Sequence, residues 1–185
     1  NNLYLVPTVK YKDRESIEKD FLRIEEQFKF ATCAPEVVED FRKMLEGIGQ
    51  HPIIIRSSSM LEDNFGLAFS GKYLSVFLTN QGGLEARLTH FIRGLKRVFA
   101  STFGPDPILY RMDHGLLDFD ERMAMVVQKV VGRRFGDYFY PFVSGVLFSR
   151  NVYAWNAKIK KEDGLGRLVL GLGTRAVDRV GSDYP

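Results

Sequence analysis

The sequence predicts an α+β fold, in which mixed sheets are covered by helices and the chain forms two small lobes. Apolar residues recur at helical spacing before residue 50 and again over residues 84–99, whereas short apolar runs rich in β-branched residues lie between and after these stretches. Helices followed by paired strands and then by more strands are typical of mixed α and β layers. The 185 residues, 45% of them hydrophobic, suffice to bury a core in one compact domain or two small lobes.

Two helices are expected before residue 50. Asp13 or Ser16 can cap the first, because a short polar side chain accepts a hydrogen bond from the first-turn amides. Its apolar stripe consists of Ile17, Phe21, Ile24 and Phe28. The second helix is expected to begin at Pro35, which suits a first helical turn, and to end at Gly47 and Gly49. The charges on both helices are interpreted as solvated surface.

Between residues 52 and 73, an apolar run is followed by charged and hydroxyl-bearing residues. Residues 53–55 are three isoleucines, which favour a strand buried on both faces. Arg56 stands where this strand leaves the core, and three serines follow it. A fixed guanidinium beside hydroxyl groups suits the oxygens of a phosphate. On these residues alone, a surface ion pair of Arg56 with Glu62 or Asp63 is almost equally well supported.

A second strand and two helices are expected next. Residues 73–79 alternate apolar and polar side chains, which predicts a strand that pairs with the preceding one. Between these strands, residues 64–72 are rich in glycine and small side chains and could form a flexible flap. After a glycine turn, residues 84–99 carry one apolar face, which predicts a long helix packed on a sheet. Residues 108–117 predict a further helix.

Three strands are expected in the last third of the chain. Residues 123–131 form an apolar run interrupted by one amide and one cation. Residues 132–141 are interpreted as an aromatic, glycine-containing loop. A strand over residues 143–151 ends in an arginine, and a last apolar strand over residues 168–170 runs into Gly-Leu-Gly.

Composition excludes several classes of protein. A net charge of +3 with 26% charged residues does not resemble the basic surface of a nucleic-acid binder. No apolar run approaches the roughly 20 residues that cross a bilayer, so no membrane partner is expected. The single Cys33 excludes an internal disulfide and fits a reducing compartment, and a cytoplasmic location is expected. The three histidines lack metal-ligand spacing and are interpreted as structural or surface residues: His51, His90 and His114.

Four segments, in order, carry a resemblance to a known family. The segments are Arg56-Ser57-Ser58 with Glu62-Asp63 and Phe69-Ser70-Gly71-Lys72-Tyr73, then Val127-Gln128-Lys129-Val130-Val131, then Gly145-Val146-Leu147-Phe148-Ser149-Arg150-Asn151, and finally Gly171-Leu172-Gly173-Thr174. Together they resemble the nucleotide-binding domain of phosphoenolpyruvate synthase and pyruvate phosphate dikinase, which has an ATP-grasp fold. The resemblance covers about residues 52–180. Neither the Gly-x-Gly-x-x-Gly fingerprint nor a lysine-bearing phosphate loop occurs at a strand-to-helix junction, so a Rossmann or P-loop nucleotide site is not supported.

The resemblance implies that residues 1–185 are part of an ATP-grasp domain that holds ATP between two lobes. Residues 1–50 would be a helical lead-in, residues 51–122 the phosphate-binding lobe and residues 123–185 the lobe on the adenine and metal side. Because the chain begins Asn-Asn without an initiating Met, it is expected to be part of a larger protein.

The resemblance also implies which residues bind ATP. Arg56 would act on the phosphates as the catalytic residue. The cofactor-binding set is Arg56, Ser57, Ser58, Lys72, Gln128, Lys129, Val130, Val131 and Arg150. Magnesium would accompany ATP, but the family's acids around Gly-Leu-Gly are replaced here by Arg167 and Thr174. Asp178 is the nearest carboxylate that could substitute as a metal ligand.

The implied function is that of an ATP-dependent phosphotransferase. Such an enzyme moves a phosphoryl group from ATP to a histidine in another domain and then to pyruvate. The phosphohistidine and phosphoenolpyruvate/pyruvate domains are absent from the 185 residues, so the fragment alone is expected to be inactive. Two alternatives stay open: a degenerate, non-catalytic or regulatory nucleotide-binding module, and a structural α+β module in which Arg56 serves only an ion pair.

Overall fold

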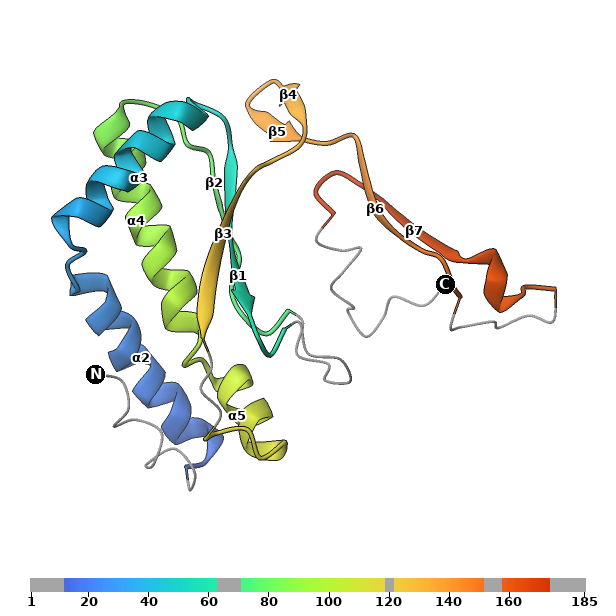
Figure 1. Cartoon of the computed structure of the whole chain (residues 1–185), viewed down its shortest axis with the longest axis horizontal. Coiled ribbons are helices and arrows are strands. Elements are labelled where there is room, and N and C mark those ends of the chain that lie inside the picture. Colours follow the sequence, from blue (N-terminus) through green and yellow to red (C-terminus); the bar gives the residue numbers. More distant parts are fainter. Residues whose placement is uncertain (1–11, 63–70, 119–121, 152–157, 174–185) are drawn as a thin grey trace. The chain divides into compact units, whose positions relative to one another are not determined.

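The computed structural model describes residues 12–62, 71–118, 122–151 and 158–173. The chain divides into two compact units, Asn1–Val130 and Val131–Pro185. Helices and small antiparallel sheets make up the described residues, and the predicted α+β class is confirmed (Figure 1). None of the described helices is long and apolar enough to span a membrane.

Four α-helices lie among the described residues of the first unit. They are α2 (Arg14–Phe30), α3 (Pro35–Ile48), α4 (Leu84–Ser101) and α5 (Pro105–Asp113). The predicted caps are confirmed at two ends, because the Asp13 carboxylate accepts from the Ser16 amide at 2.9 Å and Pro35 lies in the first turn of α3. Helix α5 begins at Pro105, three residues before its predicted start, because a proline fits the first turn of a helix as well as it fits a loop.

A three-stranded antiparallel sheet completes the first unit. Its strands are β1 (Ile53–Ser59), β2 (Val76–Leu78) and β3 (Met123–Lys129), in the order β2-β1-β3. Helix α4 runs along one face of this sheet, and α3 packs beside α4 (Figure 1). The buried core lies between these layers: Leu45, Ile53, Ile55, Val76, Leu88, Phe91, Leu95 and Val98.

Strand β1 has one covered face and one open face, so the prediction of burial on both faces is wrong. Ile53 and Ile55 are fully buried against the helices, whereas Ile54 is half-buried and Arg56 is exposed. Successive side chains of a strand point to opposite faces, and among the described helices α4 covers one face of this sheet. A continuous apolar run does not by itself distinguish a strand buried on both faces from a strand buried on one face.

The described residues of the second unit form two hairpins. Strand β4 (Arg133–Phe135) pairs with β5 (Tyr138–Tyr140), and β6 (Val143–Phe148) pairs with β7 (Leu165–Leu170), which follows the short 3₁₀ helix η2 (Lys161–Asp163). The aromatic segment predicted to be a loop is therefore a hairpin. Gly136, with φ of 61°, supplies the left-handed turn that this hairpin requires.

The boundary between the units differs from the predicted boundary between lobes at residue 122. Strand β3 forms seven residue pairs with β1, from Ile53 opposite Lys129 to Ser59 opposite Met123. This pairing places β3 in the first unit, and the chain passes into the second unit after Val130. The functions assigned to the two lobes stay predictions.

Candidate nucleotide-binding site

The open face of the β2-β1-β3 sheet brings a cation, an amide and an apolar surface together. Ile54 lies opposite both Phe77 on β2 and Gln128 on β3, and Arg56 lies opposite Val126. Directly opposite residues of an antiparallel pair share a face, so these side chains belong to the same surface. Phe77 is 43% exposed and Val126 37% exposed, which leaves an apolar platform beside the charged and amide groups.

The Arg56 guanidinium is available to a ligand. Arg56 is exposed and forms no hydrogen bond or ion pair with another described residue. Glu62, one proposed partner in the ion-pair alternative, instead accepts a hydrogen bond from the Ser57 hydroxyl at 3.2 Å. Asp63, the other proposed partner, lies outside the described residues. Within the described chain, the structure therefore does not pair Arg56 with Glu62.

The predicted serines separate onto the two faces of β1. Ser58 lies two residues after Arg56, opposite Ala124, and so shares the open face. Ser57 lies opposite Met125 on the other face, where its hydroxyl contacts Glu62. The structure thus brings Ser58 together with Arg56 but does not bring the Ser57 side chain to them. The phosphate-binding role of both serines stays a prediction.

Lys72 contacts the aromatic ring of Tyr110 on α5. Its Nζ lies 5.2 Å from the centre of the Tyr110 ring, a cation–π geometry, and Tyr110 stacks on His114 with ring centres 3.9 Å apart. The sequence did not predict these contacts of Tyr110, although Tyr110 and His114 lie at i and i+4 on a predicted helix. The flap predicted over residues 64–72 lies almost entirely outside the described residues, and the role of Lys72 stays a prediction.

Three residues of the predicted ATP-binding set lie at the end of β3 and directly after it. Gln128 and Lys129 are exposed, whereas Val130 is 8% exposed. The Val130 amide donates to the carbonyl of Pro52 at 2.9 Å, and its carbonyl lies 2.9 Å from Nε2 of His51. The sequence predicted a structural or surface role for His51, but its partner Val130 could not be identified from spacing because it lies 79 residues away.

Two predicted residues belong to the second unit. Val131 is 82% exposed and immediately follows the unit boundary. Arg150 lies 3.9 Å from a carboxylate oxygen of Glu162, and both side chains are largely exposed. An exposed ion pair of this kind contributes little to stability and leaves the guanidinium accessible. Their predicted contacts with ATP stay predictions.

The described residues do not by themselves provide a magnesium site. They contain no group of three histidine, cysteine, aspartate or glutamate side chains that could hold a metal ion. Magnesium prefers carboxylate and phosphate oxygens in octahedral geometry, and the described carboxylates do not fit that requirement as a set. Asp178, the predicted ligand, lies outside the described residues.

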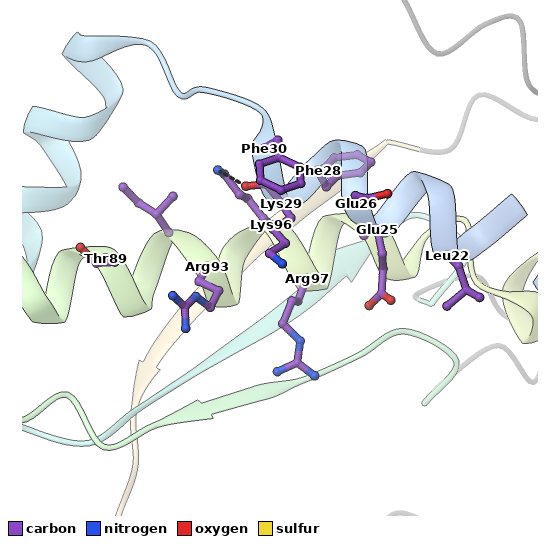
Figure 2. Close-up of a pocket in the computed structure, with 12 residues that line it drawn as sticks. Leu22, Glu25, Glu26, Phe28, Lys29, Phe30, Thr89, Arg93, Lys96 and Arg97 are labelled. Carbon is purple, nitrogen blue, oxygen red and sulfur yellow. Dashed lines mark hydrogen bonds between the residues drawn. The ribbon is translucent and has the colours of Figure 1, made fainter. Parts of the chain in front are cut away.

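A groove between α2 and α4 is separate from the open sheet face. It has a volume of about 690 Å³ and is lined by residues of these two helices (Figure 2). Lys96 crosses it and donates to the carbonyls of Lys29 and Ala31, at 3.2 and 2.5 Å, near the end of α2. None of the predicted ATP-binding residues lines this groove, so it is not the candidate site.

An exposed arginine beside an apolar platform, on the open face of a small sheet backed by helices, is suited to a nucleotide, because a base stacks on apolar surface while phosphates meet a cation. Fold and face together are compatible with an α+β nucleotide-binding domain. Residues 4–185 match the family described as pyruvate phosphate dikinase, AMP/ATP-binding domain. The chain belongs to this family, and the predicted resemblance is confirmed.

The chain is similar to three phosphotransferases. It is 30% identical to a rifampicin phosphotransferase of Bacillus cereus over 172 residues, which are 89% of this chain and 18% of the relative. A rifampicin phosphotransferase of Bacillus subtilis is 28% identical over the same shares of both chains, and one of Streptomyces sviceus is 34% identical over 133 residues. The chain spans less than a fifth of the length of these curated relatives. It is an ATP-binding domain of the kind found in this class of phosphotransferases.

Proposed function

We propose that the open face of the β2-β1-β3 sheet is where this domain holds ATP, with Arg56 at the phosphates and the end of β3 at the adenine. The observation that carries the proposal is the exposed Arg56 guanidinium, without a partner among the described residues, on the same face as Gln128 and the apolar platform. Phosphoryl transfer depends chiefly on positioning and on neutralising charge on the phosphate oxygens. A guanidinium on a regular strand supplies both.

The proposed reaction belongs to a longer polypeptide. A histidine of another domain attacks a phosphorus atom of ATP, so that a P–N bond forms while the bond to the bridging oxygen breaks and the remaining nucleotide leaves with that oxygen. A second transfer then passes the phosphoryl group to an acceptor. Phosphohistidine and acceptor domains of the same polypeptide are proposed as partners, since the relatives are more than five times as long as the matched segment.

The acceptor is proposed to be a rifampicin-like molecule. The relatives are named rifampicin phosphotransferases, and this similarity favours rifampicin over the pyruvate implied by resemblance to phosphoenolpyruvate synthase. Magnesium, a ligand role for Asp178 and a cytoplasmic location are part of the same proposal. Comparing phosphate incorporation into rifampicin and into pyruvate by the longer protein distinguishes the two acceptors.

The test of the ATP site is calorimetric titration of the chain with ATP and magnesium, comparing wild type with Arg56→Ala. A hydrogen bond to a charged group contributes about 1.5–3 kcal/mol, so we expect affinity to fall by about 10- to 150-fold. Arg93→Ala is the matched control, because Arg93 is an exposed arginine on α4 that lines the separate groove. Equal ATP affinity of wild type and Arg56→Ala would remove Arg56 from the site.

A second candidate function is nucleotide binding without phosphoryl transfer. It is favoured by Arg167 and Thr174, which replace acids of the family pattern. The longer protein, incubated with radiolabelled ATP, distinguishes the two functions. A labelled histidine supports transfer, whereas tight ATP binding without any labelled protein or acceptor supports the binding module.

A further inference from the structure

The β1–β3 ladder contains an unusual pair just beyond its last regular residues. Ile53 lies opposite Lys129, so the next position places Pro52 opposite Val130. The Val130 amide donates to the Pro52 carbonyl at 2.9 Å, which is one half of the exchange expected in a hydrogen-bonded antiparallel pair. Proline has no N–H, so Pro52 cannot supply the other half.

The side chain of His51 supplies the missing donor. Its Nε2 lies 2.9 Å from the Val130 carbonyl oxygen. A carbonyl only accepts hydrogen bonds, so Nε2 carries the proton in this contact. The imidazole therefore replaces the backbone N–H that Pro52 lacks, and Val130 keeps both backbone hydrogen bonds.

The His51 backbone is itself held in place. Its carbonyl accepts from Nδ2 of Asn80 at 2.7 Å, and the same amide nitrogen donates to the carbonyl of Gly49 at 2.8 Å. Asn80 is 6% exposed and adopts a left-handed backbone with φ of 54°, a conformation that asparagine tolerates better than most residues. The buried Asn80 amide thus fixes the backbone of His51, whose ring donates a hydrogen bond to Val130.

We propose that His51 is a positioning residue for the adenine of ATP. It acts through Val130, the last residue of the first unit, by fixing the backbone where β3 ends. This inference rests on the proposed function, in which the backbone at the end of β3 contacts the adenine. The His51 ring does not contact the nucleotide in this proposal. Its contribution is to hold the segment from Gln128 to Val130 in a single conformation before ATP arrives.

The first readout is amide hydrogen exchange at Val130 in the chain without nucleotide. His51→Ala removes the donor and is expected to speed exchange at Val130, because the residue keeps only one of its two backbone bonds. His51→Gln carries an amide nitrogen that can donate to the same carbonyl and is expected to restore slow exchange. Pro52→Ala in the His51→Ala background supplies a backbone N–H opposite Val130 and is expected to restore it as well. His90→Ala, an exposed histidine on α4, is the control.

The second readout distinguishes the contribution of the adenine contacts to ATP affinity from the contribution of the phosphate contacts. We expect His51→Ala to weaken ATP binding by about 5-fold, the value of one hydrogen bond, while leaving the affinity for inorganic tripolyphosphate unchanged. Arg56→Ala is expected to weaken both ligands. A wild-type chain that does not bind ATP refutes the proposed function, and the Val130 exchange rates still test the hydrogen bond. Unchanged exchange at Val130, or faster exchange with unchanged ATP affinity, overturns the positioning role.

Discussion

Gly94 controls how closely α4 approaches the strand that carries Arg56. It lies buried in the middle of α4 and faces the sheet. A methyl group added at Gly94 would lie 3.1 Å from Cδ1 of Ile55, 3.4 Å from Cγ1 of Val76 and 3.6 Å from Cδ1 of Leu78. The first distance is shorter than the 3.5–4.0 Å at which two carbon atoms attract most strongly. We therefore expect Gly94→Ala to be crowded by Ile55.

The expected magnitude follows from two opposing effects. Replacing glycine by alanine inside a helix stabilises it by about 1 kcal/mol, whereas overpacking a close-packed core costs about 1–3 kcal/mol. Gly94→Ala should thus lower the free energy of unfolding by about 1 kcal/mol. Ile55→Val alone should lower it by about 1 kcal/mol, but it also removes the Cδ1 atom that crowds the new methyl group. The double variant should then be close to wild type, with a coupling of about 2 kcal/mol between the two sites.

Urea unfolding of the four proteins, followed by circular dichroism, measures this coupling. Gly47→Ala is the matched control, because Gly47 lies in α3 and a methyl group there meets no atom within 4 Å. This control should be as stable as wild type or more stable. The reasoning is refuted if Gly94→Ala stabilises the protein as much as Gly47→Ala does, or if the effects of Gly94→Ala and Ile55→Val simply add.

Two further predictions concern the ends of helices. Arg87 is buried and donates through Nη1 to two carbonyls at the end of α3, at 2.9 and 2.8 Å, so Arg87→Met should lower the free energy of unfolding by about 1–2 kcal/mol. Arg93→Met, on the exposed face of α4, should change it by less than about 0.5 kcal/mol, and equal effects in urea unfolding would contradict the assignment. The Ser16 hydroxyl and then its amide lower the pKa of the Asp13 carboxyl, so this cap stabilises the fold above pH of about 4 and is lost as pH falls through the folded pKa. Thermal melting of wild type and Asp13→Asn should therefore differ at neutral pH and converge as pH falls below the ordinary aspartate pKa of about 4, and a difference that stays constant as pH falls through this acid range would contradict this origin.

Local signals predicted most of the elements because their physical causes are local. The start of α2 follows from the Asp13 cap, and the start of α3 follows from Pro35 in its first turn. The hairpin of β4 and β5 was missed because its two strands have only three residues each, and period-two alternation needs about four residues to be recognised. One-sided burial of β1 was missed because it depends on where α4 packs, which is a tertiary property.

Arg56 of the candidate site could be predicted from the sequence, whereas the apolar platform beside it could not. Arg56 followed by serines is a local pattern, and the structure places Arg56 on an open face as a phosphate ligand requires. Phe77 and Val126 join that face only through the register of β1 with two distant strands. The bond from His51 to Val130 depends on the same register, so neither spacing nor composition could reveal it.

Strand β1 therefore couples the core to the candidate site through alternate residues. Ile55 is fully buried against α4, and the next residue, Arg56, points to the open face. A close-packed core resists displacement, so the packing of Ile55 on Gly94 limits how far Arg56 can move along or across the sheet. The segment that precedes Ile53 is held in a second way, since the His51 ring donates a hydrogen bond to the carbonyl of Val130. Packing thus fixes the backbone that carries Arg56, and hydrogen bonding fixes the backbone proposed to meet the adenine.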